Sequence, residues 1–481
     1  MDFWDLNATE SRRRFLRNSG FGIGVIALAQ LLAEEGRGTE VAPVADPMAP
    51  KKPHFSPKAK NVIFLFMAGA PSQLDLFEPK PALTKYHNQP IPDSMKSALV
   101  DTFKQNARLM ASPREFKRYG QSGMPFSDLL PHTGSCADDI CMMYSLRTDI
   151  TNHHPAQLIL NCGTSMFGRP SMGSWVTYGL GSESRNLPGF VVLTSTSGLG
   201  IEGGASNWAS GFLPSNYRGV TFRSTGDPVL YLSNPHGLSG EAQRLRLDAI
   251  SDLNQHHLQS TGDIEIAART ASYELAFRMQ TSVPELGDFS KESASTLEMY
   301  GIHNEVTRPF GTNCLLARRM IERGVRFVQL YHSSWDDHAD LNKKITKNCS
   351  MIDQPTAALL RDLKQRGLLD TTLVVWGGEF GRTPMYEVRL ASPEPGKEGR
   401  DHHALAFAMW AAGGGIKGGL LFGKTDDIGF QAIENQMHVH DLQATILHCL
   451  GLDHTRLTYR HQGRDFRLTD VAGNVVHEVL T

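Results

Sequence analysis

Aspartate and histidine side chains occur together at several places in this sequence, each beside an apolar run. In "SSWDDHADL", residues 333–341, Asp336 and His338 follow an apolar segment. In "GRDHHAL", His402 and His403 precede another. One such motif alone is more often a helix cap or a hydrogen-bonded pair, but carboxylate and imidazole donors that meet at one place suit Zn²⁺ or Mn²⁺. Together the motifs predict a site for one or two divalent cations.

Three further motifs carry side chains of the same kinds. "GEFGRTP" contains Glu379 and Arg382, "MHVHD" contains His440, and "TNHHPAQLIL" places His153 at the start of a predicted helix. Arg382 is suited to bidentate binding of an anionic oxygen, although an ion pair or a helix cap explains it equally well. His440 is a candidate metal ligand, or an outer partner that orients one.

The elements that must position these motifs are short apolar runs alternating with helical stretches. This alternation predicts an α/β fold, a doubly wound and mainly parallel sheet with helices on both faces. Ligands of such sheets bind where the strands end, which is where the polar motifs occur. The expected strands are residues 61–67, 139–146, 189–194, 325–331, 372–377 and 406–413, and expected helices include 312–323, 350–365 and 441–449.

One α/β domain is expected over residues 58–481, interrupted by an insertion at about 195–310. The insertion begins with a loop rich in Gly and Ser and continues with two polar helices around 240–258 and 262–282. Such an inserted cap region over one edge of a sheet either shapes a substrate pocket or only covers the sheet.

The amino terminus predicts export. Arg12 and Arg13 precede a short apolar stretch, residues 21–33, which is too short to span a bilayer. Residues 1–35 therefore resemble a signal for the twin-arginine translocation machinery, and the alternative is a basic amphipathic start. The Pro-rich and charged residues 36–57 are expected to be a disordered linker. We expect a periplasmic or extracellular protein without a stable transmembrane span.

Overall charge and cysteine content exclude several classes of protein. The formal net charge of −2 over 481 residues argues against general electrostatic binding to nucleic acid. The six cysteines show no Cys-x-x-Cys spacing, so buried free thiols are expected, although a Cys136–Cys141 bridge is an open alternative.

Longer segments resemble a known superfamily. "LLRDLKQRGLLDTTLVVWGGEFGR", "HHALAFAMWAAGGGIKGG" and "HDLQATILHCLGLD" are similar to the alkaline phosphatase and sulfatase superfamily, over roughly residues 58–194 and 310–455. The words "PSQLD", "EFGRTP" and "GRDHH" identify the chain as a member of the exported bacterial family called domain of unknown function 1501. The resemblance implies an alkaline-phosphatase-like fold with divalent metal ions, zinc first and manganese or calcium as alternatives.

The resemblance also implies roles for particular residues. Asp336 and His338 occupy the positions of the Asp and His ligands of one metal. His402 occupies that of a later His ligand, with His403 as a near alternative. Glu379 lies at the position of the second metal's aspartate, but Phe380 replaces the histidine that normally follows it.

Two positions depart from the superfamily pattern. The first strand lacks its acidic ligand, and the nearest carboxylate is Asp75. The nucleophile position is occupied by His153, which implies covalent attack by histidine, a hydroxyl of Thr151 or Ser171, or attack by metal-bound hydroxide with His153 as a further ligand. We favour the last of these, since it also replaces the lost carboxylate.

The expected activity is therefore hydrolysis of a sulfate or phosphate ester, in a small molecule or a polysaccharide. The alternative is a metal-stabilised, non-catalytic member that binds a glycan or a protein and has lost the nucleophile. A third reading, a metal-dependent mutase or transferase, fits export less well. No nucleic-acid partner is expected.

Overall fold

One large sheet forms the centre of the molecule. The structure, a computed structural model, describes residues 46–92, 107–195, 201–223, 228–229, 232–234, 236–387 and 396–481. All six predicted strands belong to this sheet, and the α/β fold class is confirmed. The strand order is β12 (Leu420–Phe422), β4 (Ile140–Arg147), β11 (Phe407–Ala412), β8 (Thr372–Gly377), β1 (Asn61–Met67), β7 (Phe327–His332), β5 (Phe190–Thr194) and β6 (Val220–Arg223), with β15 (Met437–His438) beside β4.

One strand, β11, runs against the others. It is antiparallel to both of its neighbours, β4 and β8, whereas the remaining neighbours in this sheet pair in parallel. The residues that precede β11 therefore lie at the edge where the parallel strands end. This reversal brings a segment from before a strand to an edge that otherwise collects segments from after strands.

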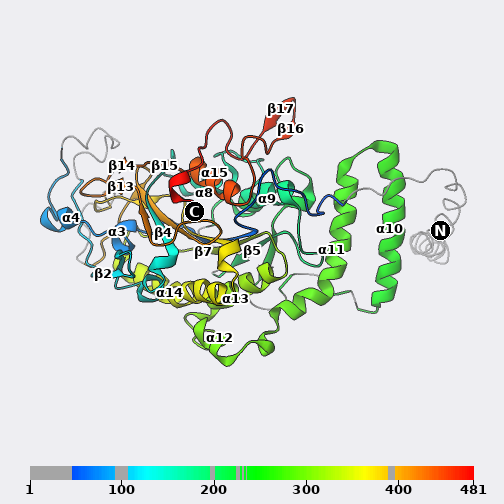
Figure 1. Cartoon of the computed structure of the whole chain (residues 1–481), viewed down its shortest axis with the longest axis horizontal. Coiled ribbons are helices and arrows are strands. Elements are labelled where there is room, and N and C mark those ends of the chain that lie inside the picture. Colours follow the sequence, from blue (N-terminus) through cyan, green and yellow to red (C-terminus); the bar gives the residue numbers. More distant parts are fainter. Residues whose placement is uncertain are drawn as a thin grey trace, which may run out of the picture.

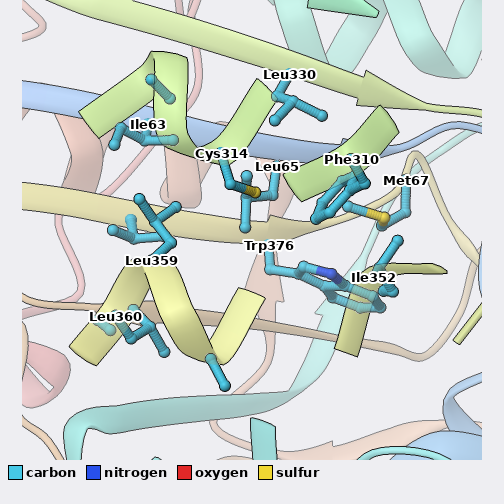
Figure 2. Packing of buried hydrophobic residues seen from close by; sticks show 14 of the residues in the cluster. Ile63, Leu65, Met67, Phe310, Cys314, Leu330, Ile352, Leu359, Leu360 and Trp376 are labelled. Carbon is cyan, nitrogen blue, oxygen red and sulfur yellow. The ribbon is translucent and has the colours of Figure 1, made fainter. Parts of the chain in front are cut away.

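Two layers of helices cover the sheet (Figure 1). One face packs against α13 (Arg308–Glu322) and α14 (Leu341–Gln365), and the other against α8 (His153–Cys162), α9 (Met172–Leu180) and α15 (Val439–Cys449). The side chains of strand β1 point alternately to the two faces of the sheet. Its side chains Ile63, Leu65 and Met67 meet the first layer (Figure 2), while Val62, Phe64 and Phe66 meet the second.

The insertion extends the sheet and then leaves it. Strand β6 pairs in parallel with β5 at the edge of the sheet, and α10 (Gly240–Thr261) and α11 (Ile264–Gly287) form a helical hairpin that projects from the body (Figure 1). Arg244 of α10 makes a bidentate contact with Glu274 of α11, at 2.8 and 2.5 Å. Both polar helices predicted here are therefore present, and they lie beyond the edge of the sheet.

Short elements complete the fold between the layers and along the rim. They connect the larger elements and are not part of the central sheet. These are α3 (Gln73–Leu76), α4 (Pro81–Lys85), β2 (Phe116–Tyr119), β3 (Met124–Ser127), α7 (Pro131–Gly134), η1 (Ala137–Asp139), η2 (Gly204–Trp208), η3 (Ser215–Tyr217), η4 (Phe289–Lys291), α12 (Ala294–Met299), η5 (Leu369–Thr371), β9 (Gly381–Arg382), β10 (His402–His403), β13 (Lys424–Thr425), β14 (Ala432–Glu434), β16 (Tyr459–His461), β17 (Arg464–Phe466) and η6 (His477–Val479).

Part of the expected disordered linker is attached to the domain. Residues 1–45, with the predicted signal, lie outside the described residues. From residue 46 onward the chain runs along the body, where Lys51 N donates to Leu180 O (2.8 Å) and His54 N to Gly451 O (2.9 Å). Residues 46–57 thus belong to the domain, because backbone carbonyls of the body accept from the amides of Lys51, His54 and Phe55.

The structure shows the state of the cysteines and the character of the helices. All six cysteines are buried free thiols, so the alternative Cys136–Cys141 bridge is not formed. Among the described residues, none of the helices combines the length and the apolar character needed to cross a bilayer.

Gly451 tests whether the segment 46–57 contributes to stability. Its φ is +75°, and a Cβ there would lie 2.5 Å from Phe55 O. Gly463 has φ +83° but open space around a Cβ. Either Gly→Ala substitution costs roughly 1–2 kcal/mol of backbone strain, and we expect Gly451→Ala to cost at least about 1 kcal/mol more. Urea denaturation measures this, and equal losses would contradict the packing of the segment.

Candidate metal centre

The candidate metal centre lies at the edge where the parallel strands end. Strand β7 ends at His332 and leads to Asp336 and His338, and strand β4 leads into α8, whose first residue is His153. His402 lies in β10, shortly before the reversed strand β11. Four side chains that are far apart in the sequence therefore meet because of strand direction, and their donor atoms lie within 4.8 Å of one another.

A tight approach of two backbone segments fixes Asp336. After β1 the chain turns through Gly69 (φ +110°), and a Cβ at this position would lie 2.6 Å from Asp336 N. Ser334 also has a positive φ, +82°, in the turn that follows β7. Only glycine allows the first segment to lie so close to the second, so the position of the aspartate depends on this turn.

Strand pairing decides between the adjacent histidines. β10 pairs with β9 so that His402 lies opposite Arg382 and His403 opposite Gly381. Directly opposed residues point to the same side of a ribbon, and successive residues point to opposite sides. His402 therefore faces Asp336 together with Arg382, and His403 faces away.

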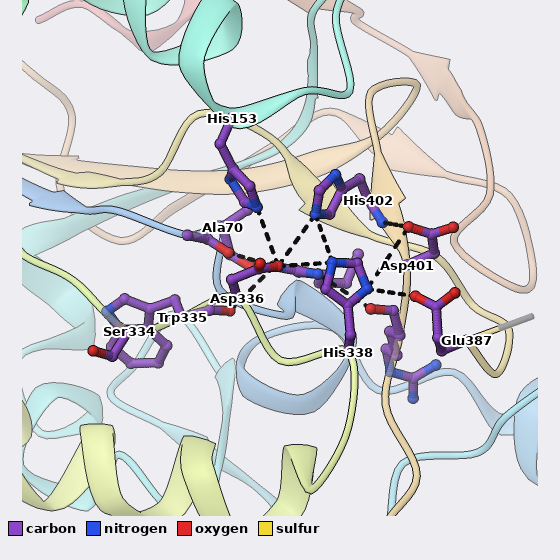
Figure 3. Close-up of polar contacts among 12 residues, drawn as sticks. Ala70, His153, Ser334, Trp335, Asp336, His338, Glu387, Asp401 and His402 are labelled. Carbon is purple, nitrogen blue, oxygen red and sulfur yellow. Dashed lines mark hydrogen bonds and ion pairs between the residues drawn. The ribbon is translucent and has the colours of Figure 1, made fainter. Parts of the chain in front are cut away.

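Asp336 Oδ1 is the hub of the cluster (Figure 3). It lies 3.1 Å from His153 Nε2, 2.9 Å from His338 Nε2 and 3.1 Å from His402 Nε2. The Nε2 atoms of His338 and His402 are themselves only 2.9 Å apart. Three imidazoles thus present the same ring nitrogen to one carboxylate oxygen.

The other ring nitrogen of each histidine faces an oxygen acceptor. His402 Nδ1 lies 2.5 Å from Thr151 O, His153 Nδ1 lies 2.7 Å from Glu379 Oε1, and His338 Nδ1 contacts Glu387 Oε2. A carbonyl oxygen can only accept, so His402 Nδ1 carries a proton, and the carboxylates favour the same for the other two. In the neutral imidazoles the three Nε2 atoms then present lone pairs to one another and to Asp336.

Converging lone pairs need a positive charge between them, and the donor set fits a metal ion. Two ligands of a tetrahedral zinc ion lie about 3.3 Å apart, given Zn–N and Zn–O distances near 2.0 Å. The separations of 2.9–3.1 Å around Asp336 Oδ1 are close to this value. His153, Asp336, His338 and His402 would hold the ion.

The electrostatics of the cluster favour positive charge. Burial lowers the pKa of His153, but hydrogen bonds and ion pairs with Asp336 and Glu379 outweigh it and raise the pKa to about 9. Burial raises the pKa of Asp336, but the three imidazoles, which donate to it when Nε2 carries a proton, and the charge of Arg382 lower it well below its usual range. The carboxylates therefore attract a proton, or a cation in its place.

Arg382 binds Asp336 from the protein interior and does not face solvent. It is fully buried, and its guanidinium donates to Ala70 O (2.9 Å), Arg400 O (3.1 Å) and Asp336 Oδ1 (2.7 Å), with further bonds to Gly69 O and Trp335 O. The expected binding of a substrate anion therefore does not fit, because its donors are already used. The ion-pair alternative is the one observed.

Glu379 and Asp75 do not join the four donors. Glu379 is fully buried, and its Oε1 accepts from Gly69 N (2.9 Å) and Gln157 Nε2 (3.1 Å) besides facing His153. It orients a histidine, which is the role of an outer partner. Asp75 lies in a buried ion pair with Arg400 (2.8 Å), which outweighs burial and lowers its pKa.

His403 and His440, also predicted as ligands, are placed elsewhere. His403 is buried, lies with Nε2 2.6 Å from Phe430 O, and burial lowers its pKa to about 4. His440 Nε2 donates to Gly163 O at 3.1 Å. Neither lies in the group of donors that could hold one ion.

Phe380 and the two hydroxyl candidates complete the comparison with the sequence. The centroid of the Phe380 ring lies 4.9 Å from that of His153 and 4.7 Å from that of His402, so an apolar ring packs against both imidazoles. Ser171 is buried and bonded to Ser174 Oγ at 2.9 Å, while Thr151 contributes its carbonyl to the centre.

Sequence reasoning missed Glu387 as a contact of His338. This residue follows "EFGRTP" by a few positions, inside a stretch without periodicity or a ligand-like spacing. The need of a metal-bound histidine for an outer acceptor was a signal, but it does not say which of several acidic residues supplies it.

Comparisons with known proteins agree with the family assignment. The sequence model of the family described as "Protein of unknown function (DUF1501)" matches residues 59–480. No curated protein sequence matches the chain.

The solved structures that resemble this chain include three proteins. An alkaline phosphatase from the Antarctic bacterium TAB5 is 13% identical with a TM-score of 0.32, covering 82% of this chain and 99% of that chain. The lipoteichoic acid synthase LtaP from Listeria monocytogenes is 10% identical, with a TM-score of 0.31 and coverage of 88% and 78%. A protein in the alkaline phosphatase superfamily from Vibrio parahaemolyticus is 10% identical, with a TM-score of 0.31 and coverage of 88% and 74%.

Metal content tests the cluster directly. We expect the purified full chain to bind about one equivalent of zinc per chain through the four donors, and His402→Ala to lose it because one ligand is gone. His440→Ala is the matched control, since this histidine lies outside the cluster, and it should retain the metal. Elemental mass spectrometry after reconstitution measures both, and metal retained in His402→Ala would contradict the assignment.

Proposed function

The chain belongs to the DUF1501 family of proteins of unknown function, and we propose that it is a metal-dependent hydrolase of phosphate or sulfate esters. The observation that carries the proposal is the convergence of His153, His338 and His402 on Asp336, each through Nε2. The Asp336 side chain is 45% exposed, so solvent reaches the carboxylate on which the donors converge. An accessible cluster of this kind suits hydrolysis.

Zinc is the ion that the donor set fits best. Three imidazole nitrogens and one carboxylate oxygen match its ligand preference, with manganese and calcium as weaker fits because they favour oxygen. When bound, a divalent ion lowers the pKa of water and polarises an ester oxygen. His153 serves as a ligand in this proposal and not as a covalent nucleophile, because its two nitrogens face Asp336 and Glu379.

The protein residues prepare the site in two ways. Arg382 and the Gly69 turn hold Asp336 in place, so its carboxylate does not need to reorganise. Phe380 packs its apolar ring against the rings of His153 and His402, which excludes water on that side. A small-molecule or polysaccharide ester would approach the exposed side chain of Asp336.

A second candidate function is a metal-stabilised protein that binds a glycan or a partner without catalysis. The observation that favours it is the number of donors. Four protein ligands can complete a tetrahedral zinc site, as in structural sites, whereas catalytic zinc sites usually leave one position open. The four donors of the cluster are compatible with either role, and activity measurements decide between them.

Hydrolysis of aryl phosphates and aryl sulfates tests the proposed activity. We expect turnover by the zinc-loaded protein, its loss with a chelator, and a decrease of kcat/KM by more than about 100-fold in Asp336→Asn, because the hub of the cluster is neutralised. Asp337→Asn is the matched control. Burial raises the pKa of that neighbouring carboxyl to about 7, so this substitution removes less negative charge than Asp336→Asn does. Bound zinc without turnover on either ester class would favour the binding protein.

Export by the twin-arginine route is proposed together with this activity. Its support is the sequence alone, in which Arg12 and Arg13 precede a short apolar stretch. Replacing both with lysine should leave the protein in the cytoplasm, because the translocation machinery reads the arginine pair, whereas Arg17→Lys should not. Cell fractionation followed by immunoblotting measures this, and unchanged export of the double variant would reject the route.

A further inference from the structure

A buried carboxylate lies behind one histidine of the metal centre. Glu387 is 3% exposed, and its Oε2 contacts His338 Nδ1 on the side of the ring opposite the cluster (Figure 3). The other nitrogen, His338 Nε2, faces Asp336 Oδ1 at 2.9 Å and His402 Nε2 at 2.9 Å. The ring is thus held between an outer carboxylate and the cluster.

The backbone holds Glu387 at this place. Glu387 N donates to Gly399 O (2.9 Å), and Arg400 N donates to Asp337 O (3.2 Å), so the segments around 387 and 399 lie beside the loop that carries His338. A Cβ at Gly399 would lie 2.0 Å from His338 O. This close approach fixes the distance between the carboxylate and the imidazole.

We infer that Glu387 is a positioning residue of the metal centre: it keeps the proton of His338 on Nδ1 and so presents the Nε2 lone pair to a divalent cation. The inference rests on the proposed metal centre but not on the reaction. A neutral imidazole has one protonated and one bare nitrogen, and an acceptor at Nδ1 selects the form that binds metal through Nε2. It also makes that nitrogen a stronger donor to the ion.

A second cation between His338, Glu387 and Asp401 is the competing explanation, since these three residues also lie close together. The distances favour a proton. Asp401 Oδ1 lies 3.9 Å from His338 Nδ1 and already accepts from His402 N at 2.8 Å. Glu387 Oε2, in contrast, contacts His338 Nδ1 directly, as a hydrogen bond requires.

Zinc titration of the full chain against a chromophoric competing chelator tests the inference. Glu387→Leu should weaken zinc binding by roughly 10- to 100-fold, because an outer partner is lost. Glu387→Gln should bind within about 10-fold of the native protein, since its amide oxygen can still accept from Nδ1. Asp401→Asn is the matched control and should change affinity little. Circular dichroism of the metal-free variants verifies folding, and Co²⁺ spectra report ligand geometry.

The possible outcomes separate the role of Glu387 from the metal centre and from the hydrolase activity. Unchanged zinc affinity of folded Glu387→Leu overturns the inference. Two equivalents of zinc in the native chain, with one lost in both Glu387→Gln and Asp401→Asn, also overturn it and show a second ion. No zinc in the native chain overturns the metal centre and the hydrolase together. Zinc binding that weakens as expected, without ester turnover, supports the inference and rejects only the hydrolase.

Discussion

The candidate metal centre depends on the attraction between the Asp336 carboxylate and the groups around it. One of its oxygens is within 3.1 Å of three imidazole nitrogens and of the buried guanidinium of Arg382. Taking such groups out of water is unfavourable unless they are paired. The glycine turn after β1 packs against the backbone of Asp336, the segment before the reversed strand β11 brings His402, and the amino terminus of α8 brings His153. The rest of the fold holds those elements in place.

The buried charged residues around the centre form hydrogen bonds and ion pairs that hold the surrounding segments together. Arg382 binds several backbone carbonyls as well as Asp336, and Asp75 pairs with Arg400. Glu379 combines a backbone amide, an amide side chain and His153. These groups resemble reactive residues in the sequence, but each is fully or almost fully buried and bonded to neighbouring groups. They hold the neighbouring donors in place and do not face solvent.

Strand direction explains why the donors converge. His338 follows β7 at the edge where the parallel strands end, whereas His402 precedes β11, which begins at that edge. An all-parallel sheet would place the start of β11 at the opposite edge. The ring of acceptors at Nδ1, drawn from a helix-preceding loop, a strand end and a later loop, then selects the nitrogen that each histidine presents.

Sequence patterns predicted the strands and all four donors that the structure brings together. Apolar runs report burial, and the motifs beside them contain the candidate ligands Asp336, His338, His402 and His153. Only the tertiary structure separated His402 from its neighbour, because the pairing of β9 with β10 decides which side chain faces the cluster. It also assigned Glu387, since contacts across distant segments leave no local periodicity in the chain. Local pattern encodes burial; register and long-range approach decide what a buried side chain meets.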